Sequence, residues 1–148
     1  MAWRFRRPKD KEHIFQSLVR EEGAPFITFK DVMMMAACIG HKIGTRVQLP
    51  PGGEQIHGGV LDEDTDQAMI DIIALCETGD IEALLDDEHQ TASKYSLFEE
   101  YCNAGLDVLK KEVLDAPGEP LDNLLALIFK EENQTPSVDR DILIDFEV

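Results

Sequence analysis

The sequence has few cysteines, no long apolar run and few basic residues after position 50. Its three cysteines, Cys38, Cys76 and Cys102, are odd in number, far apart and embedded in apolar helical patterns, which predicts buried thiols rather than a disulfide framework or a zinc site. The longest uncharged apolar run, Val32 to Ile39, is far shorter than the roughly 20 residues that cross a bilayer. The amino terminus has no signal-peptide apolar segment. We therefore expect a cytoplasmic protein without membrane contact.

Motifs that carry chemistry are also missing. The four histidines have no ligand spacing to one another or to a cysteine. The glycine-rich stretch 52–59 is not followed by the Lys-Ser/Thr pair of a phosphate-binding loop. The acidic run D62-E-D-T-D66 lacks the glycine and distal glutamate of a calcium loop, so we interpret it as a helix cap. The sequence therefore predicts no catalytic residue, no metal site, no cofactor and no enzymatic activity.

Charge is unevenly distributed along the 148 residues, whose formal net charge is −16. Residues 1–50 hold nine Lys/Arg and five Asp/Glu, whereas residues 51–148 hold five Lys/Arg and twenty-five Asp/Glu. An acidic surface of this size repels a nucleic-acid backbone and attracts basic partners. The pattern excludes general DNA binding except through the amino-terminal segment.

Two nearly all-apolar helices are predicted to form the interior. The first is capped by Thr28, which can accept a hydrogen bond from Asp31, and we expect it to end at Gly40. Because Val32 to Ile39 have no strongly polar side chain, this helix should be covered on nearly all sides. The second begins in the acidic run at residue 62 and ends at Gly79. A chain of this size has little left to cover both, so we hypothesise a homodimer that covers one.

The remaining pattern predicts a mainly α fold, a compact single-domain bundle of five to six helices over residues 10–132. Further helices are expected from Pro8 to about Glu22, at 80–87, from about Glu88 to Ala116 and after Pro120. In the long helix, Gly105 should permit close approach of a neighbour. In the last, we expect an inward face formed by Leu121, Leu124, Leu125 and Ile128. The segments 46–49 and 55–61 could pair as a small β-hairpin.

Residues 1–9, M-A-W-R-F-R-R-P-K, form a basic segment with interleaved aromatics. Such a segment can hold a phosphate backbone and stack on bases, or lie along an acidic groove of the same or a partner protein. If it contacts nucleic acid, the candidate residues, with two later cations, are Trp3, Arg4, Arg6, Arg7, Lys9, Lys42 and Arg46.

The tail, residues 133–148, mixes acids with large apolar side chains in D141-I-L-I-D-F-E-V148. This composition suits a docking strand or partner-binding peptide. The candidate partner-binding residues are Ile142, Leu143, Ile144 and Phe146. The alternative is a terminal strand or flap that packs on its own domain.

Three stretches, in order, resemble a bacterial family, the DNA phosphorothioation (Dnd) system-associated protein 4 group. They are F29-K-D-V-M-M-M-A-A-C-I-G40 with Lys42 and Arg46 after it, A74-L-C-E-T-G-D-I-E-A-L-L85, and F98-E-E-Y-C-N-A-G-L-D-V-L109. The R-R-P-K opening is similar too, whereas the region after Leu109 is not covered. The resemblance implies an accessory component of a DNA-modification and antiphage defence locus, and it brings no catalytic residue to this chain.

Four functions are therefore weighed, the last of which is an enzyme, an interpretation that no catalytic motif supports. The first is a non-enzymatic accessory protein that binds other proteins of a defence locus, with an acidic surface for a basic partner. The second is a DNA-binding subunit that uses the basic amino-terminal segment. The third is an acidic DNA mimic that inhibits a nuclease, which requires carboxylates arrayed on one exposed face.

Overall fold

The computed structural model describes residues 4–85 and 87–134, and the predicted mainly α fold is confirmed. The elements are β1 (Arg4–Arg6), α1 (Glu12–Val19), α2 (Phe29–Ile43), β2 (Gln55–His57), α3 (Asp66–Thr78), α4 (Glu88–Leu109) and α5 (Pro120–Gln134). Short 3₁₀ turns lie at Lys9–Lys11, Gly58–Val60 and Ile81–Leu84, and a π-helical turn, η4 (Lys110–Leu114), continues α4. Among the described residues, no helix is long and apolar enough to span a bilayer.

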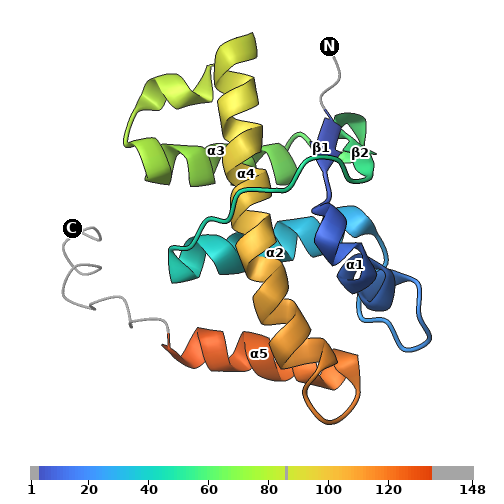
Figure 1. The fold of residues 1–148 in the computed structure, drawn as a ribbon. Helices are drawn as coiled ribbons and strands as arrows, with labels where there is room; N and C mark the ends of the chain where they lie inside the picture. The colour runs from blue at the N-terminus through green and yellow to red at the C-terminus, as the bar shows by residue number, and fades with distance from the viewer. Residues whose placement is uncertain (1–3, 86, 135–148) are drawn as a thin grey trace, which may run out of the picture.

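Helix α4 is the longest helix and runs through the centre of the molecule (Figure 1). Helix α2 crosses it near its middle, α3 packs beside its first half, and α5 packs against η4 at its far end. The apolar face that was predicted for the long helix is buried throughout, from Phe98 through Tyr101, Cys102 and Leu109 to Val113. Residues of α4 contact α2, α3, β1 and the 3₁₀ turn Ile81–Leu84.

Two glycines allow α2 and α4 to pack backbone against backbone. A Cβ on Gly105 of α4 would overlap the carbonyl oxygen of Ala36, and a Cβ on Gly40 of α2 would overlap the carbonyl oxygen of Tyr101. No side chain can be inserted at either position without moving one helix away from the other. The predicted role of Gly105 in close helix approach is therefore confirmed.

Helix α2 begins as predicted but ends later. The Thr28 hydroxyl oxygen accepts from the backbone N–H of Asp31 at 3.2 Å. The expected end at Gly40 is wrong, because Gly40 is an interior residue of the helix that is needed at the α4 crossing. The helix ends instead at Gly44, whose φ of 71° lies in the left-handed region that favours glycine.

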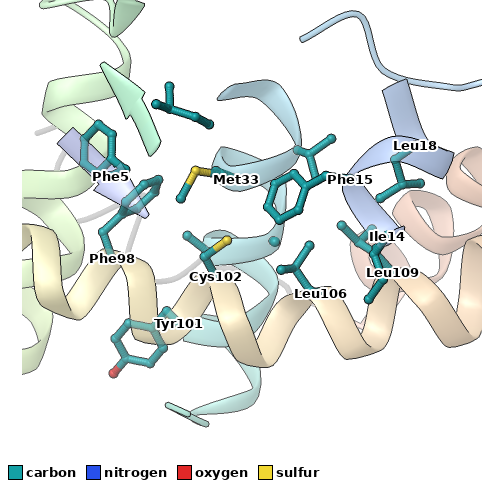
Figure 2. Close-up of a cluster of buried hydrophobic side chains, with 14 of the residues drawn as sticks. Phe5, Ile14, Phe15, Leu18, Met33, Phe98, Tyr101, Cys102, Leu106 and Leu109 are labelled. Atoms are coloured by element: carbon teal, nitrogen blue, oxygen red, sulfur yellow. The ribbon is translucent and has the colours of Figure 1, made fainter. Parts of the chain in front are cut away.

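The core fills the space between β1, α1, α2 and α4, and Figure 2 shows Phe15, Met33, Cys102 and Leu106 meeting there. Phe5 of β1 is fully buried, with its ring centroid 4.6 Å from that of Tyr95 and 5.2 Å from that of Phe98. Edge contacts of this kind stabilise the core beyond simple area burial. Phe5 thereby anchors the amino-terminal segment to α4.

Strand β2 pairs with a different segment of the chain from the one that was predicted. Strand β2, at Gln55–His57, lies within the expected region, but it pairs antiparallel with β1, so that Phe5 faces Ile56. The pairing of 46–49 with 55–61 is wrong. Burial of Phe5 brings β1 to β2, while residues 46–49 run along α4, where the side-chain amide of Asn103 donates to the Val47 carbonyl at 3.1 Å.

The first helix and the second apolar helix are both shorter than expected. Helix α1 ends at Val19 rather than near Glu22, but its predicted face is buried through Ile14, Phe15 and Leu18. Helix α3 starts at Asp66 and ends before Gly79, whose φ is 67°. The acidic run before it forms a turn, in which Asp62 Oδ1 accepts from the backbone N–H groups of Asp64 and Thr65. The predicted side-chain cap is wrong in detail, because the N-cap residue Thr65 makes no side-chain capping hydrogen bond and the backbone carbonyl of Asp62 accepts from Gln67 instead.

Replacing Gly105 with alanine should test the α2–α4 crossing. We expect Gly105→Ala to lower the free energy of unfolding by at least about 2 kcal/mol, since the overlap with the Ala36 carbonyl outweighs the better helix propensity of alanine. Urea denaturation followed by circular dichroism measures the change. Ser96→Ala, at an exposed position of the same helix, is the control and should stay within about 0.5 kcal/mol. Unchanged or higher stability of Gly105→Ala would contradict the close crossing.

Candidate protein-docking surface

The face of α2 that points away from α4 is only partly covered by the described residues. Val32, Met33, Ala36, Ala37 and Gly40 are buried on the α4 side, whereas Met34, Met35, Cys38 and Ile39 are half-buried. The expectation that this helix is covered on nearly all sides therefore holds fully for the side that faces α4 and only in part for the opposite side. The crossing helix α4 can cover one side of α2, and no other described element fully closes the opposite side.

Two neighbouring hollows lie along this partly covered face. The α2–α5 hollow, of about 260 Å³, is lined by Met35, Cys38, Ile39, Lys42, Leu127 and Ile128. The α2–α3 hollow, of about 390 Å³, is lined by Phe26, Asp31, Met34, Met35, Cys38, Thr65, Asp66 and Met69. Both hollows have Met35 and Cys38 in their walls, so they are neighbours, and we call the two together the groove. Methionine side chains are flexible and polarizable, and they suit a surface that adapts to a partner.

Helix α5 extends the apolar surface outward. Its exposed side chains recur at helical spacing and form one stripe: Leu121, Leu125, Ile128 and Phe129, of which Phe129 is 61% exposed. The predicted inward face is wrong for Leu121, Leu125 and Ile128 and right for Leu124. The rotation of α5 is fixed by the Asn123 side chain, which donates to the Val113 and Ala116 carbonyls, so Leu124 and Leu127 face inward.

Helix α3 is also half uncovered. Ile70, Ile73 and Ala74 are buried, but Ile72 is 53% exposed and Cys76 is exposed. The predicted burial of all three cysteines holds for Cys102, while Cys38 is half-buried and Cys76 is not buried.

We call the groove and the α5 stripe together the docking face, because contiguous exposed apolar surface of this kind is typical of protein interaction sites.

Charges differ between the two ends of the groove. Asp31 and Asp66 lie at the α2–α3 end, where Asp66 pairs with Lys30 at 2.9 Å. This hydrogen bond is the main reason that the pKa of Lys30 is raised. Lys42 lies at the α2–α5 end. The groove therefore offers apolar contacts between an acidic and a basic end.

The cations predicted to contact nucleic acid are dispersed, and several are bound to carboxylates of the same chain. Arg7 is buried, forms a two-pronged contact with Glu12 at 2.8 and 2.9 Å, and stacks 4.2 Å above the Phe29 ring. Arg46 pairs with Glu77 at 3.3 Å. Arg4, Lys9 and Lys42 are exposed. Trp3 lies outside the described residues, as do Ile142, Leu143, Ile144 and Phe146 of the tail.

Arg6 connects β1 to α4 and to the loop before β2. Its guanidinium lies 3.6 Å from Glu99 Oε2 and donates to the Pro50 carbonyl at 3.2 Å. Burial raises the pKa of Glu99 to about 7, and the nearby Arg6 offsets only part of this shift. The amino-terminal segment thus lies along acidic groups of its own domain, which is one of the two alternatives that its composition left open.

A second cluster of titratable groups sits between α3 and α4. Lys94 is buried and its ammonium lies 2.9 Å from Asp71 Oδ1, and the Gln67 amide donates to the Tyr95 hydroxyl at 2.8 Å. The Tyr101 hydroxyl donates to Glu77, and burial, with this contact, raises the pKa of Tyr101 to about 12. All three contacts tie α3 to α4. Within residues 4–85 and 87–134, no three His, Cys, Asp or Glu side chains are arranged to hold a metal ion.

Fold and surface together define a small helical protein with an exposed apolar docking face. A sequence model described as DNA sulphur modification system-associated protein 4 matches residues 4–146. The chain belongs to this family, as the resemblance predicted, and the match extends through the region after Leu109 that the three stretches did not cover. No curated protein and no solved structure matches the chain significantly.

Glu99 gives the fold a testable pH dependence. Its folded pKa of about 7 exceeds the ordinary value of 4.5, so its contribution to stability is fully present below pH 4.5 and is lost as pH rises through 7. We expect Glu99→Gln to remove this loss, so that the variant gains stability relative to wild type between pH 4.5 and 8. Urea denaturation at several pH values measures the difference. A stability difference that does not change with pH would contradict burial of this carboxyl.

Proposed function

We propose that this chain is a non-enzymatic accessory protein of a DNA sulphur-modification system, which binds a basic protein of the same locus on its docking face. The observation that carries the proposal is the apolar groove of α2 beside the outward stripe of α5. Family membership supports the link to the modification system. A role in antiphage defence and a cytoplasmic setting belong to the same proposal.

Charge selects the chemistry of the partner. The net charge of −16 favours association with a basic surface and accelerates it at low salt. The same charge on two copies opposes self-association, so a basic protein suits this face better than the homodimer. Apolar contacts then supply affinity, and the acidic surroundings supply selectivity and rate.

DNA mimicry has less support than docking, because many carboxylates serve the fold itself. Asp80 caps the 3₁₀ turn Ile81–Leu84 by accepting from the N–H of Glu82, and Asp87 caps α4 by accepting from the N–H of Gln90. Asp71 and Glu77 hold Lys94 and Arg46. Carboxylates engaged in this way are not a regular array that imitates phosphates.

Substitutions on the docking face should separate it from the rest of the surface. We expect Phe129→Asp and Met35→Asp each to weaken capture of a basic protein from the native locus at least about tenfold, as for central interface residues. Binding is measured by co-purification and calorimetry with full-length proteins. Ser96→Asp, which adds the same charge at an exposed position of α4, is the matched control and should bind like wild type. Equal binding by the wild type and all three variants would contradict the assignment of the docking face.

DNA contact is tested with the exposed cations of the amino-terminal segment. If the chain acts through protein contacts, Arg4→Glu combined with Lys9→Glu should leave DNA affinity and its salt dependence unchanged. A DNA-binding role through this segment would instead lower the salt slope by about two, roughly one for each phosphate contact. Fluorescence anisotropy with labelled duplex DNA, measured across a range of salt concentrations, distinguishes the two results.

A further inference from the structure

The α2–α5 hollow lies close to the point where the described part of α5 ends. Ile128 lines the hollow, and α5 continues to Gln134, about 9 Å further along the helix axis. The carboxy-terminal ends of α2 and α5 lie on the same side of the molecule (Figure 1). Any segment that follows α5 therefore begins within reach of this hollow.

The sequence after Gln134 has the length and chemistry to fill it. Residues 135–148 can span roughly 46 Å when extended. They include the apolar side chains Ile142, Leu143, Ile144 and Phe146, flanked by Asp141, Asp145 and Glu147. The apolar group matches the walls of the hollow. The acids match the positive charge of Lys42 in the hollow.

We propose that residues 141–146 of the same chain bind in the α2–α5 hollow and cover Cys38 and Ile128. Attachment to α5 favours this occupant over others, because a tethered segment has an effective concentration on the order of millimolar. A second copy would have to overcome repulsion between two chains of charge −16. The short apolar group needs to bind only weakly to stay in place.

One consequence of this tail position rests on the proposed function and deepens it. Ile128 belongs both to the hollow and to the α5 stripe, so the tail and a basic partner compete for it. The tail then regulates access to the docking face. Displacing the tail should strengthen partner binding, whereas the position of the tail itself does not depend on there being a partner.

Thiol alkylation tests the inference because the three cysteines report on different places. Cys38 lines the hollow, Cys76 is exposed on α3, and Cys102 is fully buried. The full chain is treated with iodoacetamide at pH 8.5, because burial raises the pKa of Cys38, and each thiol is quantified by mass spectrometry. The test variant is Leu143→Asp with Phe146→Asp. The control, Thr135→Asp with Ser137→Asp, adds the same charge in the polar part of the tail.

We expect Cys38 to react about tenfold faster in the test variant than in wild type, the factor for a tethered segment whose intrinsic Kd is about 0.1 mM. Cys76 should keep its rate, the control should react like wild type, and an unreactive Cys102 shows that each fold is intact. Equal Cys38 rates in all three proteins would overturn the inference. Protection that grows with protein concentration would overturn it too, in favour of a second copy.

The same variants separate this inference from the proposed function. If Cys38 is released in the test variant but no basic protein of the locus binds any variant, the tail occupies the hollow and the proposed function fails. If partner binding is lost in the test variant while Cys38 reactivity is unchanged, the tail contacts the partner directly and the inference is overturned.

Discussion

The backbone contact between α2 and α4 is the constraint on which the rest of the molecule depends. Gly40 and Gly105 let the two helices approach until each backbone fills the space that a Cβ of the other would occupy. This contact fixes the crossing and therefore which side of α2 is buried. Phe5, Phe15 and Phe98 then fill the space beside the crossing, and the amino-terminal strand is held to α4 as a result.

The same constraint produces the candidate functional surface. Because α4 takes one side of α2, the apolar residues on the opposite side are left for α3 and α5, which pack at the two ends of α4 and leave a groove between them. A helix that is apolar all round usually indicates complete burial. Here it indicates a helix with one face fully buried in the core and the other face half-buried beside a groove.

Sequence reasoning predicted the elements better than their contacts. Caps such as Thr28, stops such as Gly79 and the buried stripe from Phe98 to Val113 follow from local chemistry and helical periodicity, and they were located correctly. The features that were predicted wrongly depend on contacts with residues distant in the sequence. Gly40 does not end its helix because Tyr101 packs on it, and Leu125 faces outward because Asn123 binds η4.

The sequence also could not show how its basic residues are used. A run of arginines next to aromatics looks the same whether it meets phosphates or the chain's own carboxylates. In the fold, Arg6 meets Glu99, Arg7 meets Glu12, and Lys11 meets Asp107 at 3.0 Å. Carboxylates up to about a hundred residues away in sequence therefore engage much of the positive charge of this segment.

Hydrogen–deuterium exchange of the full chain, alone and bound to a basic protein of its locus, tests the central claim most directly. The account predicts added protection of amides in residues 34–42 and 121–130, with little change in residues 4–11. Protection concentrated in residues 4–11, with α2 and α5 unaffected, would contradict it.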